Sequence, residues 1–307
     1  MDPSSSLSNR SDATEAPGAA LGQLGLVVHP TRPVERVLEE ILAWAAAHTV
    51  AVGQVPVPGQ SRQVADPIDA AACDLLLALG GDGTALTALH AGAPSSRPVL
   101  GVACGSIGVL TSVSAERVTW ALEQVAAGRW TPLAVSGLDV ALAEAHEGVA
   151  INDVAIVRDG TGQILVSVTV DGVLYAQVAG DGLVVATTLG SSAYAMAAGG
   201  PILAPGAEGM VVTPLAAHGG SFPPLVAGNA STLTLAIEPG YGGVRGEIDG
   251  RPTPLAGRVM TVRHRPRYAT LATLAEDEPR LTGLRRRGLV IDSPRAKLRG
   301  QRAVPPA

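Results

Sequence analysis

Short apolar runs and helical patterns alternate along the first 130 residues of the chain. Four runs without polar alternation are typical of strands buried on both faces of a parallel sheet, at residues 24–30, 50–57, 75–79 and 98–103. Apolar positions at helical spacing predict helices over residues 34–47 and 115–128. Strands that alternate with helices predict a doubly wound α/β domain, whose ligand crevice lies at the loops that follow the strands.

After residue 130 the pattern changes to short β runs separated by Gly, Asp and Asn turns. These runs cover residues 138–143, 149–157, 163–170, 173–178, 183–186, 210–215, 231–237, 246–248 and 258–263. Asp171-Gly172 is a hairpin signal, and residues 191–199 form a short Ala-rich helical pattern. This half predicts a β-rich second domain, and the Arg-rich segment 278–307 predicts a solvated helix and tail.

A glycine turn follows the most apolar of the predicted strands, with the sequence Gly80-Gly81-Asp82-Gly83-Thr84. A strand, a Gly-rich turn and a helix start form a geometry in which free backbone N–H groups can hold phosphate. Asp82 would repel phosphate unless a cation or a transferable proton is involved, so it is a candidate general base or partner of Mg²⁺. The alternative is that the motif is a tight turn without chemistry.

Composition limits the possible partners. Of the 307 residues, 47% are apolar and 16% are charged, which is typical of a globular chain with room for one large or two ordinary domains. A net charge of −5 and few aromatic residues argue against a nucleic-acid partner. Two cysteines cannot form a disulfide framework, so a reduced, cytoplasmic protein is expected. Residues 1–20 predict a disordered tail, and no run is long enough to cross a membrane.

A second cluster of small residues runs from Gly180-Asp181-Gly182 to Ala193-Tyr194. Ser191 and Ser192 either cap the following helix or present hydroxyls to a nucleotide. Asn152-Asp153 lies in a β run, where an amide beside a carboxylate suits vicinal ribose hydroxyls, although Asn-Asp is also common in turns. The Walker-type loop, the dinucleotide Gly-x-Gly-x-x-Gly after the first strand and the serine-hydrolase elbow are all absent, and the six histidines show no metal-ligand spacing.

In their order and spacing these motifs resemble the NAD kinase family. The matching segments are Gly80-Gly81-Asp82-Gly83-Thr84, Asn152-Asp153, 181–194, Gly199-Gly200-Pro201, 214–218, 222–226 and Asp249-Gly250-Arg251. The resemblance spans residues 24–295. The first of these motifs is shared with lipid kinases of the diacylglycerol and sphingosine type, whereas the second cluster favours NAD kinase.

The resemblance implies a particular architecture and donor system. It predicts an α/β N-terminal domain, an all-β, sandwich-like C-terminal domain, a site between them, and a homodimer or homotetramer. The expected division is a tail at 1–20, domains at 21–132 and 133–268, and a segment 269–307 that packs back on the first domain. ATP and Mg²⁺ are the implied phosphoryl-donor system, with polyphosphate as the alternative donor that some members of the family use, and a small-molecule acceptor is the substrate.

The resemblance also assigns roles by position. Asp82 would be the catalytic base, and the donor phosphates would lie against Gly80, Gly81, Gly83 and Thr84. The acceptor would be bound by Asn152, Asp153, Asp181, Ser191, Ser192, Ala193, Tyr194 and His218. No residue is assigned to a metal.

Five positions depart from the family pattern. Asp153 replaces a glutamate, Ala103 an asparagine, Val109 a phenylalanine, Leu189 a hydroxyl residue and Pro223 an arginine. The phosphate-binding residues are intact, so the departures concern acceptor recognition. The predicted activity is ATP-dependent phosphorylation of the ribose 2′-hydroxyl of NAD(H), with weak affinity for NAD. The alternatives are the same transfer to a nucleoside, sugar or cyclitol, or a catalytically idle NAD(P) sensor; a lipid kinase ranks lower.

Overall fold

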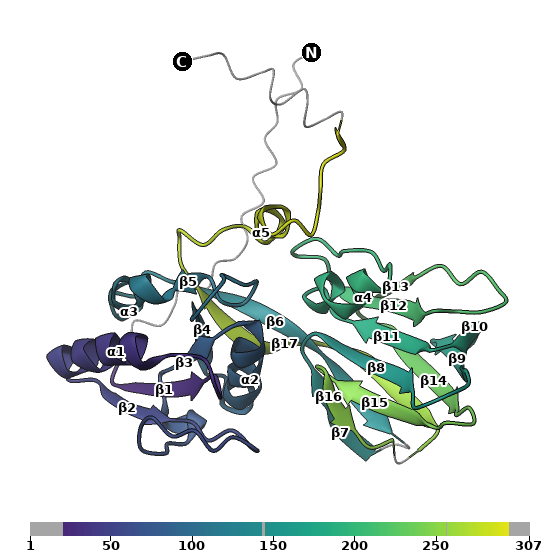
Figure 1. The fold of residues 1–307 in the computed structure, drawn as a ribbon, viewed down its shortest axis with the longest axis horizontal. Coiled ribbons are helices and arrows are strands. Elements are labelled where there is room, and N and C mark those ends of the chain that lie inside the picture. Colours follow the sequence, from purple (N-terminus) through teal and green to yellow (C-terminus); the bar gives the residue numbers. More distant parts are fainter. Residues whose placement is uncertain (1–20, 143–144, 256, 295–307) are drawn as a thin grey trace.

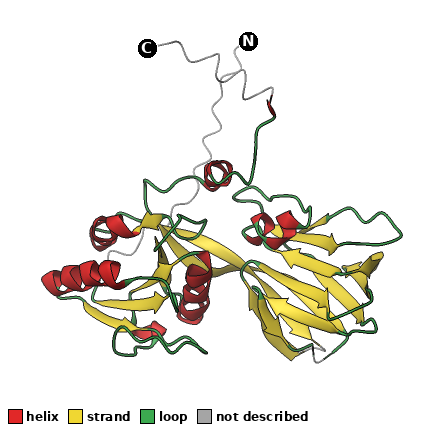
Figure 2. Cartoon of the chain, in the orientation of Figure 1, coloured by secondary structure: helices red, strands yellow, loops and turns green. Residues whose placement is uncertain are grey.

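The computed structural model describes residues 21–142, 145–255 and 257–294. The predicted tail at residues 1–20 and the residues from 295 onward lie outside these ranges. Figure 1 shows two lobes, one with helices packed on a sheet and one built almost entirely of strands. Figure 2 shows the same contrast by secondary structure. The predicted α/β first domain and β-rich second domain are confirmed.

The first lobe is a doubly wound unit. Its parallel strands are β1 (Gln23–Val28), β2 (Ala51–Gln54), β3 (Leu75–Gly80) and β4 (Pro98–Ala103), in the order β4-β3-β1-β2, with the short β5 (Val113–Ser114) beside β4. Helices α1 (Glu35–His48) and α3 (Val118–Ala126) cover one face, and α2 (Asp82–Gly92) covers the other. In β1, Leu24 and Leu26 pack against α1 and α3, whereas Val27 packs on the side of α2. Burial on both faces explains why these strands are apolar at nearly every position.

The second lobe is a sandwich of two antiparallel layers. One layer is a six-stranded sheet, β13-β12-β11-β8-β15-β16, formed by Leu225–Gly228, Gly209–Leu215, Gly182–Ala186, Asp153–Arg158, Val244–Ile248 and Arg251–Thr253. The other contains β10 (Val173–Gly180), β9 (Ile164–Val170), β14 (Thr232–Glu238), β17 (Val259–Thr273), β6 (Thr131–Leu142) and β7 (Ala145–Ala150). Side chains of the two layers, such as Val185 and Leu235, meet in one core. The layers therefore stabilise each other by apolar burial.

Two long strands, β6 and β17, connect the lobes. β17 pairs with β14 in the second lobe through Thr232 and Arg263, and with β4 in the first lobe through Pro98 and Thr270. β6 lies antiparallel to β17 over most of its length, so one eleven-stranded sheet runs through both lobes. The expected boundaries after residues 132 and 268 fall inside these two strands.

The helix predicted over residues 191–199 is shorter in the structure. Residues 190–192 form a 3₁₀ turn, and α4 covers only Tyr194–Ala197 of the predicted 191–199 helix. Further 3₁₀ turns cover residues 70–72, 93–95 and 115–117. The C-terminal helix α5 (Arg280–Arg286) lies above the junction of the lobes in Figure 1. Among the described residues, no helix has the length and apolar character needed to cross a bilayer.

Candidate active site

The predicted glycine turn lies at the carboxyl end of β3. The strand is buried along its length and ends at Gly80, and α2 begins at Asp82. The side chain of Thr84 packs against Gly80. Only glycine fits at position 80, because a Cβ there would overlap Oγ1 of Thr84. The first turn of any helix leaves N–H groups without partners inside the helix, and the helix dipole makes that end electropositive. The turn therefore presents the end of α2 that favours an anion.

A cavity of about 370 Å³ faces this turn. It is lined by the turn and α2, by the end of β1 and by the loop after β2, at residues 27–30, 32, 57–60, 81–84 and 87. The guanidinium of Arg32 lies over the glycine turn, with Nη1 3.1 Å from the Cβ position of Gly81 and 3.2 Å from that of Gly105. A guanidinium beside a helix N-terminus is a suitable partner for phosphate oxygens.

The loop that carries Arg32 is held by a second arginine. Nη1 of Arg62 donates to the carbonyl oxygens of His29 and Arg32, at 3.0 and 2.6 Å, and Nη2 of Arg62 contacts the Glu35 carboxylate at 2.6 Å. Nδ1 of His29 accepts the N–H groups of Thr31 and Arg32. Burial, followed by the charges of Arg32 and Arg62, lowers the pKa of His29. The positive charge in this region therefore comes from the arginines.

The Asp82 carboxylate is bonded to the loop that follows β4. Its oxygens accept the N–H groups of Val109 and Leu110 at 2.8 and 2.9 Å, and the hydroxyl of Thr111 at 3.3 Å. The residue that the sequence identifies as a base is thus also an anchor for the segment in which Val109 departs from the family pattern.

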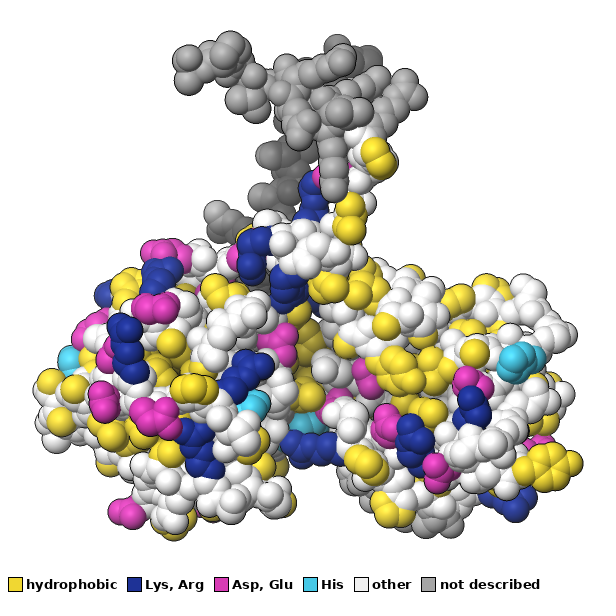
Figure 3. All heavy atoms as spheres, viewed as in Figure 1, with side chains coloured by type: hydrophobic (Ala, Val, Ile, Leu, Met, Phe, Trp, Pro, Cys, Tyr) yellow, Lys and Arg dark blue, Asp and Glu magenta, His cyan; other side chains and the backbone are white. Residues whose placement is uncertain are grey.

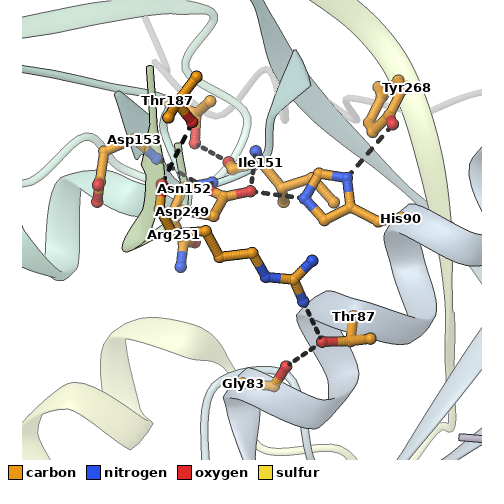
Figure 4. Close-up of polar contacts among 11 residues, drawn as sticks. Gly83, Thr87, His90, Ile151, Asn152, Asp153, Thr187, Asp249, Arg251 and Tyr268 are labelled. Carbon is orange, nitrogen blue, oxygen red and sulfur yellow. Dashed lines mark hydrogen bonds and ion pairs between the residues drawn. The ribbon is translucent and has the colours of Figure 1, made fainter. Parts of the chain in front are cut away.

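Asp153 begins β8 in the second lobe, Asn152 precedes it directly, and the backbone of both residues is fixed by Asp249. Oδ1 of Asp249 accepts the N–H groups of Asn152 and Asp153 at 2.7 and 3.2 Å, and Oδ2 accepts that of Ile151 at 2.8 Å (Figure 4). The Asp249 side chain is only 2% exposed. Because a buried carboxylate needs donors to offset its lost hydration, these backbone contacts explain how it remains inside the protein.

Asp153 is itself a perturbed carboxyl group. Burial, together with the negative charges of Asp249 and Glu247, raises the pKa of Asp153 from 3.8 to about 7. Desolvation and like charge both disfavour the ionised form. A buried carboxyl group that titrates near neutral pH is typical of a functional site.

The loop from Thr187 to Ser192 packs directly on Asn152. The N–H of Thr187 donates to the Asn152 carbonyl at 2.9 Å, and a Cβ on Gly190 would overlap the same oxygen. Ser191 is fully buried, donates to the carbonyl of Thr188 and accepts the N–H of Leu203, so its hydroxyl stabilises the loop. The structure therefore brings the Asn152 backbone and this loop together.

A half-buried arginine from α5 holds the same loop. Nη2 of Arg280 donates to the carbonyl oxygens of Thr188 and Leu189, at 2.7 and 2.8 Å, and to Oγ of Ser192 at 3.0 Å. Burial, followed by the charge of Arg287, lowers the pKa of Arg280. The segment that the sequence predicts to be solvated thus reaches the predicted nucleotide-binding loop.

Two positions that depart from the family pattern line one cavity. Val109 and Leu189 both face a cavity of about 640 Å³ between the lobes, together with Arg280. A smaller apolar side chain at position 109 leaves more room than an aromatic ring would. The departures therefore change the shape of one continuous space beside the predicted acceptor loop.

Asp181 and Tyr194 lie together in a separate open hollow of about 530 Å³. Asp181 forms an ion pair with Arg158 at 2.6 Å. Tyr194 is 38% exposed, and burial followed by the negative charge of Glu247 raises its pKa, with smaller contributions from Asp153 and Asp181. The hollow is thus electrostatically close to Asp153, but it is distinct from the cavity at the glycine turn.

The remaining predicted residues lie around these spaces. Ala193 is exposed immediately before α4. His218 is exposed on the loop after β12, where its N–H donates to the Ala179 carbonyl, and it lines none of the cavities described above. Figure 3 shows that the face of the molecule is hollowed between the lobes, with Lys or Arg side chains near the hollow.

Sequence reasoning missed the contacts of Arg32 and Arg280. Arg32 follows the first strand, and the ends of parallel strands meet at one edge of a sheet, so its position was a usable signal. Arg280 was hidden in an Arg-rich segment. Among the described residues, no group of three or more His, Cys, Asp or Glu side chains is placed to hold a metal ion.

Models of one protein family match both lobes of the chain. The chain matches the family model of the ATP-NAD kinase N-terminal domain over residues 24–130 and that of the ATP-NAD kinase C-terminal domain over residues 151–262. It is 32% identical over 238 residues to an NAD kinase of Nitratidesulfovibrio vulgaris strain Hildenborough, covering 74% of this chain and 77% of the relative.

Two solved structures share the fold. Yeast NADH kinase complexed with NADH superposes with a TM-score of 0.77 at 21% identity, over 90% of this chain and 89% of the other. An NAD kinase from Archaeoglobus fulgidus in complex with ATP gives a TM-score of 0.69 at 22% identity, over 88% of this chain and 100% of the other. At these identities the superpositions show the fold alone.

Proposed function

This chain belongs to the NAD kinase family, and we propose that it transfers the γ-phosphate of ATP to the ribose 2′-hydroxyl of NAD or NADH. The observation that carries the proposal is the cavity in which Arg32 lies over the glycine turn at the start of α2. Phosphoryl transfer depends mainly on positioning and on neutralisation of charge, and this cavity combines a cation with a helix N-terminus.

The donor and acceptor are assigned to opposite sides of the cleft. The ATP phosphates bind against Gly80, Gly81, Gly83 and Thr84, beside Arg32. The acceptor ribose binds at Asn152 and Asp153, and the rest of the dinucleotide lies along Asp181, Ser192, Ala193 and Tyr194. Ser191 is buried behind these residues, where its hydroxyl holds the loop. Asp82, in the first turn of α2 beside the donor residues, takes the hydroxyl proton, while its bonds to Val109 and Leu110 hold the neighbouring loop. A contact of His218 with the acceptor stays a prediction.

Mg²⁺ fits this site as a partner of the nucleotide. Asp82 is the single carboxylate among the described residues that line the glycine-turn cavity. Mg²⁺ is commonly held by one or two carboxylates together with substrate phosphates. We therefore expect it to bind with ATP, where it supplies further neutralisation of phosphate charge.

The proposal includes a homodimer or homotetramer in the cytoplasm. Strand β10 lies at the edge of the large sheet, where Val173 and Leu174 are 71% and 57% exposed. An exposed apolar edge strand favours pairing with another chain. The free thiols of Cys73 and Cys104 are those expected in a reducing compartment.

The first test is a phosphotransfer assay with ATP and Mg²⁺, in which NAD and NADH are compared with nucleosides, sugars and cyclitols. Formation of NADP or NADPH at an ordinary enzymatic rate, above about 1 s⁻¹, is the expected result. Transfer only to another acceptor would contradict the assigned substrate while keeping the donor site. If no acceptor in the panel is phosphorylated, the kinase assignment is contradicted.

The donor site has its own test in Gly83→Ala. A Cβ on Gly83 meets no atom within 4 Å, so the substitution creates no clash in the free protein. If a phosphate of ATP lies against this glycine, the alanine methyl group occupies the space that the phosphate needs. The KM for ATP should then rise about tenfold, while the melting temperature stays unchanged. Gly228→Ala is the matched control, because its Cβ also meets open space but lies on β13, away from the cavity. An unchanged KM for ATP in Gly83→Ala would contradict the phosphate assignment.

A further inference from the structure

Helix α2 contacts the second lobe through His90, eight positions after Asp82 along the same helix. Nε2 of His90 lies 2.6 Å from Oδ2 of Asp249, and Nδ1 lies 3.4 Å from the hydroxyl of Tyr268. Figure 4 shows the imidazole between these two groups. His90 thus joins the helix that begins at the glycine turn to a residue of the second lobe and to the shared strand β17.

Asp249 occupies the turn between β15 and β16. Its φ of 49° and that of Gly250, 71°, are both in the left-handed region, as a tight Asp-Gly hairpin turn requires. The same carboxylate that accepts from His90 also accepts the N–H groups of Asn152 and Asp153. One buried carboxylate therefore links α2 directly to the backbone of the predicted acceptor pair.

A second contact from the same turn reaches α2 closer to its start. Nη2 of Arg251 donates to Oγ1 of Thr87 at 2.7 Å, and this hydroxyl donates to the carbonyl of Gly83 at 3.0 Å. Figure 4 shows both contacts in one line from the hairpin to the glycine turn. The hairpin consequently holds α2 at two points.

We propose that His90 and Asp249 form a brace across the cleft, which sets the distance between the glycine turn and the backbone of Asn152 and Asp153. In this brace His90 is a positioning residue for phosphoryl transfer. The inference rests on the proposed function, because it assigns the donor to one end of the brace and the acceptor to the other. Its physical basis is that the contacts cross between lobes through one buried, fully bonded carboxylate.

Loss of the brace should affect the chemical step more than binding. His90 lies outside the residues assigned to either substrate, so the affinity for each should be kept. A displacement of about 1 Å between reacting groups can lower a rate by about 100-fold. We therefore expect kcat to fall between about tenfold and 100-fold in His90→Ala, while the KM values for ATP and NAD change less than about threefold.

Replacement by amides separates positioning from packing. In His90→Gln the side-chain NH₂ can take the place of Nε2 and donate to Asp249, whereas the shorter side chain of His90→Asn does not reach it. We expect kcat to return to within about threefold of the wild type in the Gln variant and to stay low in the Asn variant. His48→Ala is the matched control, because His48 also contacts a carboxylate, Glu123 at 3.3 Å, but within the first lobe. It should leave kcat unchanged.

Hydrogen exchange provides a readout that does not depend on activity. Amides in residues 149–155, which include the partners of Asp249, should exchange faster in His90→Ala and His90→Asn than in the wild type or His90→Gln. Unchanged exchange and unchanged kcat in His90→Ala would overturn the brace, as would equal losses in the Gln and Asn variants. If the wild type phosphorylates neither NAD nor NADH, the proposed function fails, and the exchange pattern alone decides whether the brace exists.

Discussion

Gly108 leaves the space that the carboxylate of Asp82 occupies: a Cβ on Gly108 would overlap Oδ1 of Asp82. The same carboxylate accepts the N–H groups of Val109 and Leu110, so the loop after β4 closes on the first turn of α2. The residue expected to act on the acceptor hydroxyl is therefore held in place by the loop that carries one of the departures from the family pattern.

Gly108→Ala should separate this loop from Asp82. The φ of Gly108 is not among the left-handed values, so the backbone accepts alanine and the effect comes from the added methyl group. We expect kcat to fall by about 100-fold, since Asp82 must move to relieve the overlap. Steady-state kinetics beside the Gly228→Ala control measure this effect. A kcat equal to that of the control would show that Asp82 needs no contact with the loop.

Asp153→Asn should change the dependence of stability on pH. The pKa of Asp153 is about 7 in the folded protein and 3.8 in the unfolded reference, so the folded state binds more protons between these values. The wild type therefore loses stability from this group as the pH rises through that window, and the loss is complete above pH 7. The quantity to compare is the unfolding free energy of the Asn variant minus that of the wild type. This difference should be more favourable to the variant at pH 8 than at pH 3.5, by up to about 4 kcal/mol.

Urea denaturation of both proteins at the two pH values measures this difference. Asp159→Asn is the control, because the Asp159 side chain is 65% exposed and its ion pair with Arg245 is long, at 3.8 Å. Its effect should stay below about 1 kcal/mol. A pH-independent difference for Asp153→Asn would mean that the carboxyl group is ionised at little cost in the fold.

Arg280→Ala should weaken acceptor binding. The variant loses the three contacts to the carbonyl oxygens of Thr188 and Leu189 and to Ser192, which hold the predicted dinucleotide loop. The KM for NAD should rise about tenfold, while that for ATP stays constant, because a freed loop loses its preorganisation. Arg285→Ala, which removes an α5 arginine that is 60% exposed and pairs with Asp292, should change neither value. Equal changes in the KM values for NAD and ATP would show that Arg280 stabilises the fold as a whole and not the acceptor loop in particular.

Arg158→Ala tests whether Asp181 meets the acceptor. The Arg158–Asp181 pair is 2.6 Å long, with side chains 36% and 39% exposed, so its loss should lower the unfolding free energy by less than about 1 kcal/mol. We expect the KM for NAD to rise about fivefold because Asp181 loses the partner that orients it. Arg36→Ala, which breaks an exposed pair with Glu40, should match the small loss in stability without changing KM. Identical kinetics in the two variants would remove Asp181 from the acceptor site.

The elements and the glycine turn before α2 follow from local sequence. Unbroken apolar runs such as residues 75–79 predict doubly buried strands, and the glycines after them permit the tight turn into α2. The change to short alternating runs predicts the second, β-rich domain. These features depend on residues that are neighbours in the chain, so they can be predicted from the sequence alone.

The contacts that shape the cleft were decided by tertiary structure. His90 and Asp249 are 159 positions apart, and Arg280 and Thr188 are 92 apart, so no local pattern relates them. They meet because β6 and β17 run through both lobes and fix the distance between elements that are remote in the chain. Propensity and periodicity describe each element by itself, whereas the partners of a buried charge depend on how the elements pack together.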